Sequence, residues 1–187
     1  MPRLLVALML LPFVLAACSD GDAPLSDDQQ AFLDTYQAYC GAAYAGESRH
    51  VDLGDESPLI DADLQVTFET CSDEAVRAPF YVDDDTSRTW TLDVVEEGLR
   101  LAHDHRHPDG SEYEANMYGG LADEQGSTTK QFFSADARTI DDRPSRDINV
   151  WSKEFDLANE RYYYRLYLDD ELAYEAAFDL SAPLTDD

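Results

Sequence analysis

Basic residues are scarce in this 187-residue chain, which has 40 aspartates and glutamates against 13 lysines and arginines. Lysine is nearly absent, because Lys130 and Lys153 are the only two and the other basic residues are arginines. A formal net charge of −27 repels phosphate backbones and anionic lipid headgroups, so nucleic acid is excluded as a partner. The same charge favours cationic ligands or divalent ions, and it suits a protein exposed to high salt.

Motifs for catalysis are also few. No Cys-x-x-Cys pair occurs among the three cysteines, which argues against redox catalysis. The chain has no nucleophile elbow, no phosphate-binding glycine loop and no serine, histidine and aspartate in a protease-like order. Carboxylate pairs are numerous, but 40 acidic residues produce such pairs by chance. The sequence therefore favours a binding or interaction protein over an enzyme.

The longest apolar run stands at the N-terminus. Met1-Pro2-Arg3 is basic, and Leu4 to Val14 is apolar but too short to span a bilayer comfortably. The order Leu15-Ala16-Ala17-Cys18 then resembles the lipobox of bacterial lipoproteins. This resemblance covers the first 18 residues. It implies that residues 1–17 are a signal peptide and that Cys18 becomes a lipidated N-terminus.

A lipidated Cys18 implies a protein anchored in the cell envelope and facing the periplasm, with palmitate among its acyl chains. Several chains anchor firmly, since each buried methylene adds about 0.8 kcal/mol. In enteric-type sorting, Ser19 after the cysteine favours the outer membrane over the inner one, while Asp20 leaves the leaflet open. The expected partners are the membrane, through the lipid, and a small ligand or an envelope protein.

Cys40 and Cys71 remain once Cys18 carries lipid. An even pair of cysteines in an oxidising compartment predicts a disulfide bond between them. The polar residues 18–25 are typical of a short tether, and residues 26–187 are enough for one domain with a substantial core. Neither an internal repeat nor a second domain is indicated.

One helix is predicted, over residues 26–46. Ser26 and Gln29 have the spacing of a capping box, in which each side chain bonds the other residue's backbone amide. Apolar side chains then recur along one helical face: Phe32, Leu33, Tyr36, Cys40, Ala43 and Tyr44. Gly46 is a suitable end for the helix, and Cys40 on its apolar face would join it to the segment that carries Cys71.

After the helix, apolar residues alternate with polar ones, which is typical of strands. Eight or nine short strands with intervening turns are indicated, and the clearest lie around residues 64–71, 90–94, 99–107, 113–117, 130–134, 148–151, 161–168 and 172–180. No helices alternate with them. The chain is therefore expected to be mainly β, an antiparallel barrel or sandwich, with a lipocalin-like barrel as one option.

Three of the four histidines lie two residues apart, at His103, His105 and His107. On a strand they share one face. Pro108-Asp109-Gly110 suits a type I turn with a glycine bulge, which pairs His107 with Ser111, His105 with Tyr113, His103 with Ala115 and Leu101 with Met117. This register sorts the charged side chains onto the opposite face. The histidines and Tyr113 would then line the mouth of the barrel as a ligand-binding site.

A competing register pairs His107 with Glu112. His105-x-His107-x4-Glu112 then resembles the first metal-binding motif of the cupins, whose histidines and glutamate bind a divalent transition metal. The match is partial, because the leading Gly98 is misplaced and no later histidine exists; His50 would have to substitute. His103, His105 and His107 are thus candidate metal ligands, although no cofactor is the first expectation. Acidic neighbours should raise the pKa of these histidines.

The stretches His103 to Gly110, Met117 to Gly120 and Tyr174 to Leu180 resemble a group of uncharacterised proteobacterial secreted proteins and lipoproteins. That resemblance implies compartment and fold without an activity. The first hypothesis for function is an envelope lipoprotein that binds a small ligand or protein partner at the histidine end of a β-barrel. The alternatives are a metal-dependent cupin-like enzyme and a purely structural or interaction lipoprotein.

Overall fold

The computed structural model describes residues 25–185, and the predicted signal peptide, Cys18 and nearly all of the tether lie outside them. The described chain contains two α-helices and two short 3-10 helices: α1 (Asp27–Thr35), η1 (Tyr36–Tyr39), α2 (Ala137–Asp142) and η2 (Pro144–Arg146). It contains these strands: β1 (Ala43–Val51), β2 (Asp63–Thr67), β3 (Thr70–Cys71), β4 (Ala75–Val82), β5 (Asp85–Val95), β6 (Gly98–His105), β7 (Tyr118–Ala122), β8 (Lys130–Ala135), β9 (Asn149–Asp156), β10 (Arg161–Leu168) and β11 (Glu171–Asp179).

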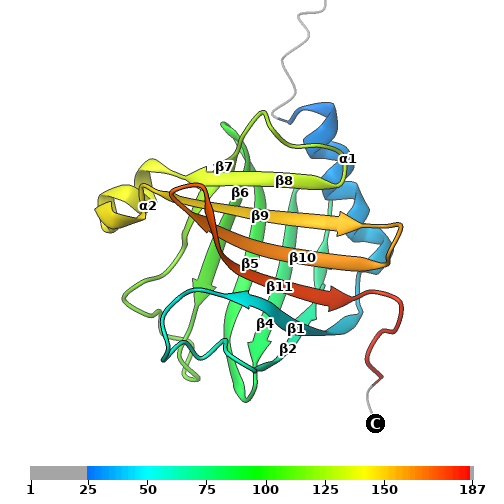
Figure 1. Ribbon diagram of the computed structural model, residues 1–187. Coiled ribbons are helices and arrows are strands. Elements are labelled where there is room, and N and C mark those ends of the chain that lie inside the picture. The colour runs from blue at the N-terminus through cyan, green and yellow to red at the C-terminus, as the bar shows by residue number, and fades with distance from the viewer. Residues whose placement is uncertain (1–24, 186–187) are drawn as a thin grey trace, which may run out of the picture.

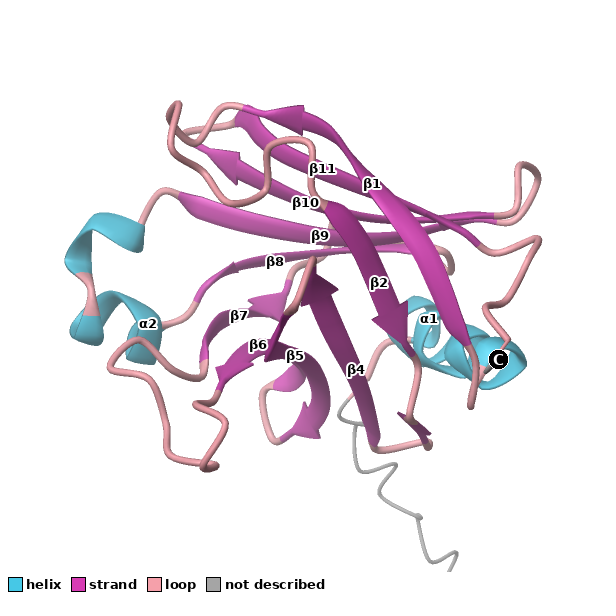
Figure 2. Cartoon of the chain, turned by 90° about the horizontal axis from the view of Figure 1, so that it is seen from below, coloured by secondary structure: helices cyan, strands magenta, loops and turns pink. Residues whose placement is uncertain are grey.

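The strands form a closed antiparallel barrel (Figures 1 and 2). The order is β2-β1-β11-β10-β9-β8-β7-β6-β5-β4, and β2 pairs with β4 to complete the ring, while the short β3 continues along β4. The expected mainly β, antiparallel fold is confirmed, and it is a barrel rather than a sandwich. The ring has ten strands, compared with eight in a lipocalin. A ring with more strands encloses a wider interior. Large side chains fill part of this interior, and any part that they do not fill remains as a cavity.

Helix α1 and η1 close one end of the barrel. The capping box is confirmed, since Gln29 N–H donates to the Ser26 hydroxyl and Ser26 N–H donates to the Gln29 side chain. Phe32 and Tyr36 are buried and pack against Phe155, Phe32 at a tilted angle and Tyr36 edge-on. The Tyr36 and Tyr162 hydroxyls share a 2.8 Å hydrogen bond in this buried layer.

The predicted helix 26–46 is wrong in its last part. Helical structure ends at Tyr39, and residues from Ala43 onward form β1. Gly46 lies inside that strand, where a Cβ would come within 2.4 Å of the Phe178 ring. The error has a physical cause: Tyr36 and Tyr44 are eight residues apart, a separation at which helical and strand periodicities both place them on one face.

Cys40 and Cys71 form the predicted disulfide, with Cα atoms 5.9 Å apart. The bond connects the end of η1 to β3, and so it fixes the helical segment that closes the barrel to one of the strands. Its contribution is about 3–4 kcal/mol in the chain-entropy model.

Other strands differ from expectation. Strand β4 was not predicted, although its inward Val76, Ala78 and Phe80 are buried; Pro79 interrupts its pattern. Residues 113–117, predicted as a strand, form a loop, and Met117 has a positive φ of 56°. Helix α2 was not predicted either, since the only expected helix was at residues 26–46. None of the helices in residues 25–185 has the length and hydrophobicity needed to span a bilayer.

Candidate functional site

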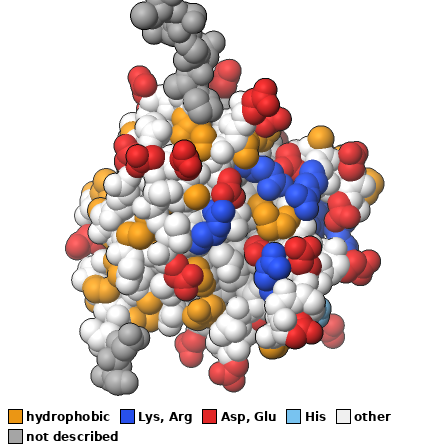
Figure 3. Space-filling view, turned by 180° about the vertical axis from the view of Figure 1, so that it is seen from behind, with side chains coloured by type: hydrophobic (Ala, Val, Ile, Leu, Met, Phe, Trp, Pro, Cys, Tyr) orange, Lys and Arg blue, Asp and Glu red, His pale blue; other side chains and the backbone are white. Residues whose placement is uncertain are grey.

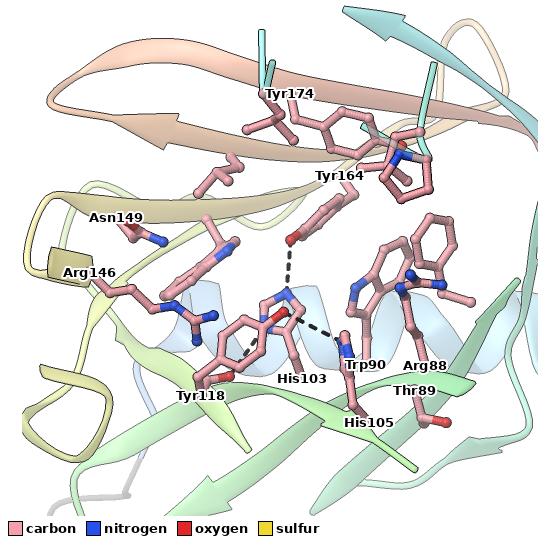
Figure 4. A pocket seen from close by; sticks show the side chains of 16 residues that line it. Arg88, Thr89, Trp90, His103, His105, Tyr118, Arg146, Asn149, Tyr164 and Tyr174 are labelled. Atoms are coloured by element: carbon pink, nitrogen blue, oxygen red, sulfur yellow. Dashed lines mark hydrogen bonds between the residues drawn. The ribbon is translucent and has the colours of Figure 1, made fainter. Parts of the chain in front are cut away.

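A cavity of about 210 Å³ opens at the end of the barrel opposite α1 (Figure 4). Its side walls are aromatic and its rim carries cationic and amide groups. The 52–62 connection between β1 and β2 lies over it with Leu53, Pro58 and Leu59. The sixteen lining residues are Leu53, Pro58, Leu59, Phe80, Arg88, Thr89, Trp90, His103, His105, Tyr118, Arg146, Asn149, Trp151, Tyr164, Leu166 and Tyr174.

His103 is held rigidly in the wall of this cavity. Its Nδ1 lies 3.1 Å from the Tyr118 carbonyl oxygen, which can only accept, so Nδ1 carries the proton. Its Nε2 then accepts from the Tyr164 hydroxyl at 2.8 Å. The imidazole also stacks on the Tyr118 ring, with centroids 4.6 Å apart. Both ring nitrogens are occupied, and His103 is therefore a positioning residue for the two tyrosines.

His105 lies nearer the opening. Its Nε2 is 3.4 Å from the Tyr118 hydroxyl, a long contact that a bound molecule could replace. Burial lowers its pKa, and Arg88 lowers it further. Burial also lowers the pKa of His103 well below its usual value, with Lys153 adding to the effect. The predicted rise in histidine pKa is wrong for these two residues, because burial disfavours the charged imidazolium more than the neighbouring acidic groups favour it, and Arg88 and Lys153 add to the effect of burial.

His107 and Tyr113 lie outside the cavity. Their rings stack with centroids 3.8 Å apart, and Tyr113 is 39% exposed. The turn register that predicted them is confirmed at the tip, where Ser111 O accepts from His107 N–H and Tyr113 N–H donates to His105 O. It fails further down, since His103 pairs with Tyr118 and Leu101 with Gly120. The loop at 114–117 shifts the register by three residues, and this shift brings Tyr118 into the site.

The cavity differs in charge from the rest of the chain. None of its lining residues is acidic, although 40 of the 187 residues in the sequence are. It contains Arg88 and Arg146 instead. Figure 3 shows one outer face of the molecule, where several basic side chains lie close together among scattered acidic ones. The expectation that the negative net charge favours cationic ligands does not hold at this cavity. Local charge decides what a pocket attracts.

The two arginines have different partners. Arg88 Nη1 forms a 2.5 Å ion pair with Asp85. Arg146 lies over the Tyr118 ring, with Cζ 3.8 Å from the centroid, and its Nη1 is buried without a hydrogen-bond partner in the described chain. Burial lowers the pKa of Arg146. Its guanidinium is thus a partly buried cation whose N–H groups are not fully used.

Lys153 lies one layer below the cavity. It is 1% exposed, and its Nζ is 3.0 Å from the Trp90 ring centroid and 4.3 Å from that of Tyr164. The Nζ atom has no hydrogen-bond partner among residues 25–185. Burial lowers the pKa of this lysine well below 10.5. The Lys153 amine therefore packs against Trp90 and Tyr164, two of the rings that line the cavity.

The competing cupin-like register is wrong, because Glu112 pairs with Arg106 instead of His107. His50, the proposed substitute ligand, lies on β1 with Nε2 2.9 Å from the Leu172 carbonyl oxygen. No three His, Cys, Asp or Glu side chains in residues 25–185 are grouped to hold a metal ion. His103 and His105 line the cavity, whereas His107 stacks on Tyr113 outside it, so the three histidines do not converge on one ion.

Two comparisons with known proteins give no match: no protein-family model fits the sequence, and no curated protein is significantly similar to it.

Sequence reasoning missed Arg88, Arg146 and Lys153. For Lys153 the alternation was informative, because Trp151, Lys153 and Phe155 share one face of β9 and all three are buried. The predicted strand at 148–151 began instead at Ile148, which is 44% exposed, and it ended before Lys153. Nothing in the local pattern predicts Arg146, since its place in the cavity depends on the connection between α2 and β9.

Proposed function

We propose that this protein is a lipid-anchored protein of the bacterial envelope that binds a small ligand in the open end of its barrel. The observation that carries the proposal is the cavity beside His103 and His105, with aromatic walls and a few convergent polar groups. Such a combination is the usual composition of small-molecule sites. The lipobox-like sequence at Cys18 supports the anchor and the compartment.

The size of the cavity limits the ligand. About 210 Å³ is less than the roughly 300–1,000 Å³ of pockets that hold drug-sized molecules. The walls are largely formed before binding, because Trp151 is 1% exposed and His103 is bonded at both nitrogens. A small, rigid molecule fits these constraints better than a peptide or a long acyl chain. Binding, rather than chemistry, is the function that this site supports.

Tryptophan fluorescence tests the proposal directly. Trp90 and Trp151 are the only tryptophans of the chain, and both line the cavity. A ligand in the cavity should therefore change their emission in a saturable way. Filling the cavity with Leu166→Tyr is expected to weaken binding at least about tenfold, which corresponds to about 1.4 kcal/mol.

The matched control is Leu157→Tyr, since Leu157 is 50% exposed in the turn between β9 and β10, away from the cavity. It should bind as the unmodified protein does. A panel of small aromatic and aliphatic compounds of each charge, none of which changes the emission, would contradict the proposed function. Equal binding by both variants would place the ligand elsewhere.

The anchor is tested in the intact cell. The protein should incorporate labelled palmitate and remain with the membrane fraction. Cys18→Ser should abolish both properties, because the acyl chains attach at this residue. Cys40→Ser is the control, as it removes a cysteine that forms the disulfide and should keep the label. Palmitate incorporation that survives Cys18→Ser would refute lipidation at this position.

A further inference from the structure

We infer that the ligand of the cavity is a small planar aromatic anion whose carboxylate binds the Arg146 guanidinium. This inference rests on the proposed function and adds a chemical class to it. Three independent features of the cavity carry it: a cation without an acidic partner among residues 25–185, a wall without carboxylates, and aromatic side chains around a small volume.

The cation is the first feature. Arg146 has one face on the Tyr118 ring, but a ring face does not accept from the in-plane N–H groups of guanidinium. Its Nη1 is buried and without a hydrogen-bond partner in the described chain. A planar carboxylate offers two parallel acceptors in the geometry that guanidinium favours. A carboxylate in the cavity would pair with the part of the guanidinium that lines it, since Arg146 is half-buried and has no ion-pair partner among residues 25–185.

The lining is the second feature. In a chain with 40 acidic residues, none of the sixteen lining residues is Asp or Glu. An anionic ligand therefore meets no repelling carboxylate among these side chains. Arg88, although paired with Asp85, adds a second cation on the other side of the opening. His105 Nε2 and the Tyr118 hydroxyl lie between them and provide a donor for a second polar group.

The aromatic walls are the third feature. Tyr118 stacks on His103 at an interplanar angle of 7°, and Trp90 stacks on Phe80 at 13°. These contacts fix the rings in place, and Figure 4 shows Tyr118, Tyr164 and Trp90 arranged around the space that Arg146 approaches. Aromatic side chains around a cavity can contact another ring edge to face, which favours an aromatic ligand over an alkyl chain. The volume of about 210 Å³ suits a molecule of one or two rings.

The test compares acids with their neutral isosteres in the mature protein, using titration calorimetry. Benzoate and 2-naphthoate should bind at least about tenfold more tightly than benzamide and 2-naphthamide, because a charged hydrogen bond is lost in the amide. Hexanoate should bind more weakly than benzoate, and benzylamine should not bind detectably. These comparisons need no variant, so they do not depend on whether a substitution folds.

Arg146→Met should reduce the acid-to-amide preference to nearly one, since methionine keeps an apolar stem over Tyr118 without the charge. Arg138→Met is the matched control, because Arg138 is exposed in α2 and outside the cavity, and it should keep the preference. Acids that bind no better than amides would overturn the anionic assignment while leaving ligand binding intact. Hexanoate binding as tightly as benzoate would overturn the aromatic assignment. Failure of every compound would overturn the proposed function as well.

Discussion

Replacement of Lys153 by methionine is expected to raise the free energy of unfolding at pH 7 by about 1–4 kcal/mol, the range found when buried charged groups are replaced by apolar ones of similar volume. Lys153 is 1% exposed and its Nζ has no hydrogen-bond partner among residues 25–185, so folding either removes water from the ammonium group or removes its proton. Contacts with the Trp90 and Tyr164 rings stabilise only the charged form and offset part of its desolvation cost. Methionine has a similar length and no charge, so it should fill the site without the penalty.

Lys153 should also make the free energy of unfolding depend on pH. The folded-state pKa of Lys153 is lowered, so the unfolded state binds the extra proton and stability rises with pH between the folded value and 10.5. The slope in this range is positive and at most about 1.4 kcal/mol per pH unit, because a single proton is involved. Above about pH 10 the buried tyrosines oppose it, because burial raises the pKa of Tyr162 and Tyr164 and their unfolded forms ionise first.

Urea unfolding at several pH values measures both effects. Lys130→Met is the matched control, since Lys130 is the other lysine and forms a partly exposed ion pair with Glu154 at 3.2 Å. Its effect should stay within about 1 kcal/mol. A slope between pH 7 and 9 that is the same in Lys153→Met and in the unmodified protein would show that Lys153 remains charged in the fold.

Gly119→Val is expected to lower the free energy of unfolding by on the order of 4 kcal/mol and to disrupt the cavity. A Cβ at this position would lie 1.9 Å from the Leu101 carbonyl oxygen, so β7 must move away from β6. Gly119 is also held from the other side, because Thr139 Oγ1 accepts from its N–H at 2.7 Å and donates to its carbonyl at 2.8 Å. Overpacking and lost backbone hydrogen bonds add together here.

The Gly119→Val substitution should also affect the cavity, because the preceding residue in the chain is Tyr118. Tyr118 carries the ring that stacks on His103 and supports Arg146, so displacement of β7 should weaken ligand binding and alter the emission of Trp151. Leu121→Val is the control, since it places the same side chain on the same strand without a backbone clash. Unchanged stability and emission in Gly119→Val would contradict the close approach of β6 and β7.

Local rules predicted much of the barrel. The capping box at Ser26 needs only residues three apart, and the turn at Pro108–Gly110 needs only its own chemistry, and both are present. The disulfide followed from cysteine number and compartment. Strands β9, β10 and β11 follow the predicted segments because their alternation and turns are regular.

The cavity could not be predicted in the same way. Its polar groups come from β5, β6, β7 and the connection after α2, which meet only when the ring closes. Tyr118 reaches the cavity because of the loop at 114–117, where Met117 adopts a positive φ. A positive φ is usually predicted from a glycine, and this position has none. A buried lysine and a partly buried arginine run against composition rules, since such side chains are seldom found inside. Three histidines drew attention, but only His103 and His105 line the cavity.

The position of α1 has a consequence for how the molecule would stand on a membrane. The helix begins beside the 123–129 connection, at the end of the barrel that β7 reaches as it runs away from Tyr118 and the cavity. A lipid attached at Cys18, a few residues before Leu25, would hold this closed end toward the bilayer. The mouth would then be membrane-distal, and its ligand would arrive from the aqueous space rather than from the lipid phase.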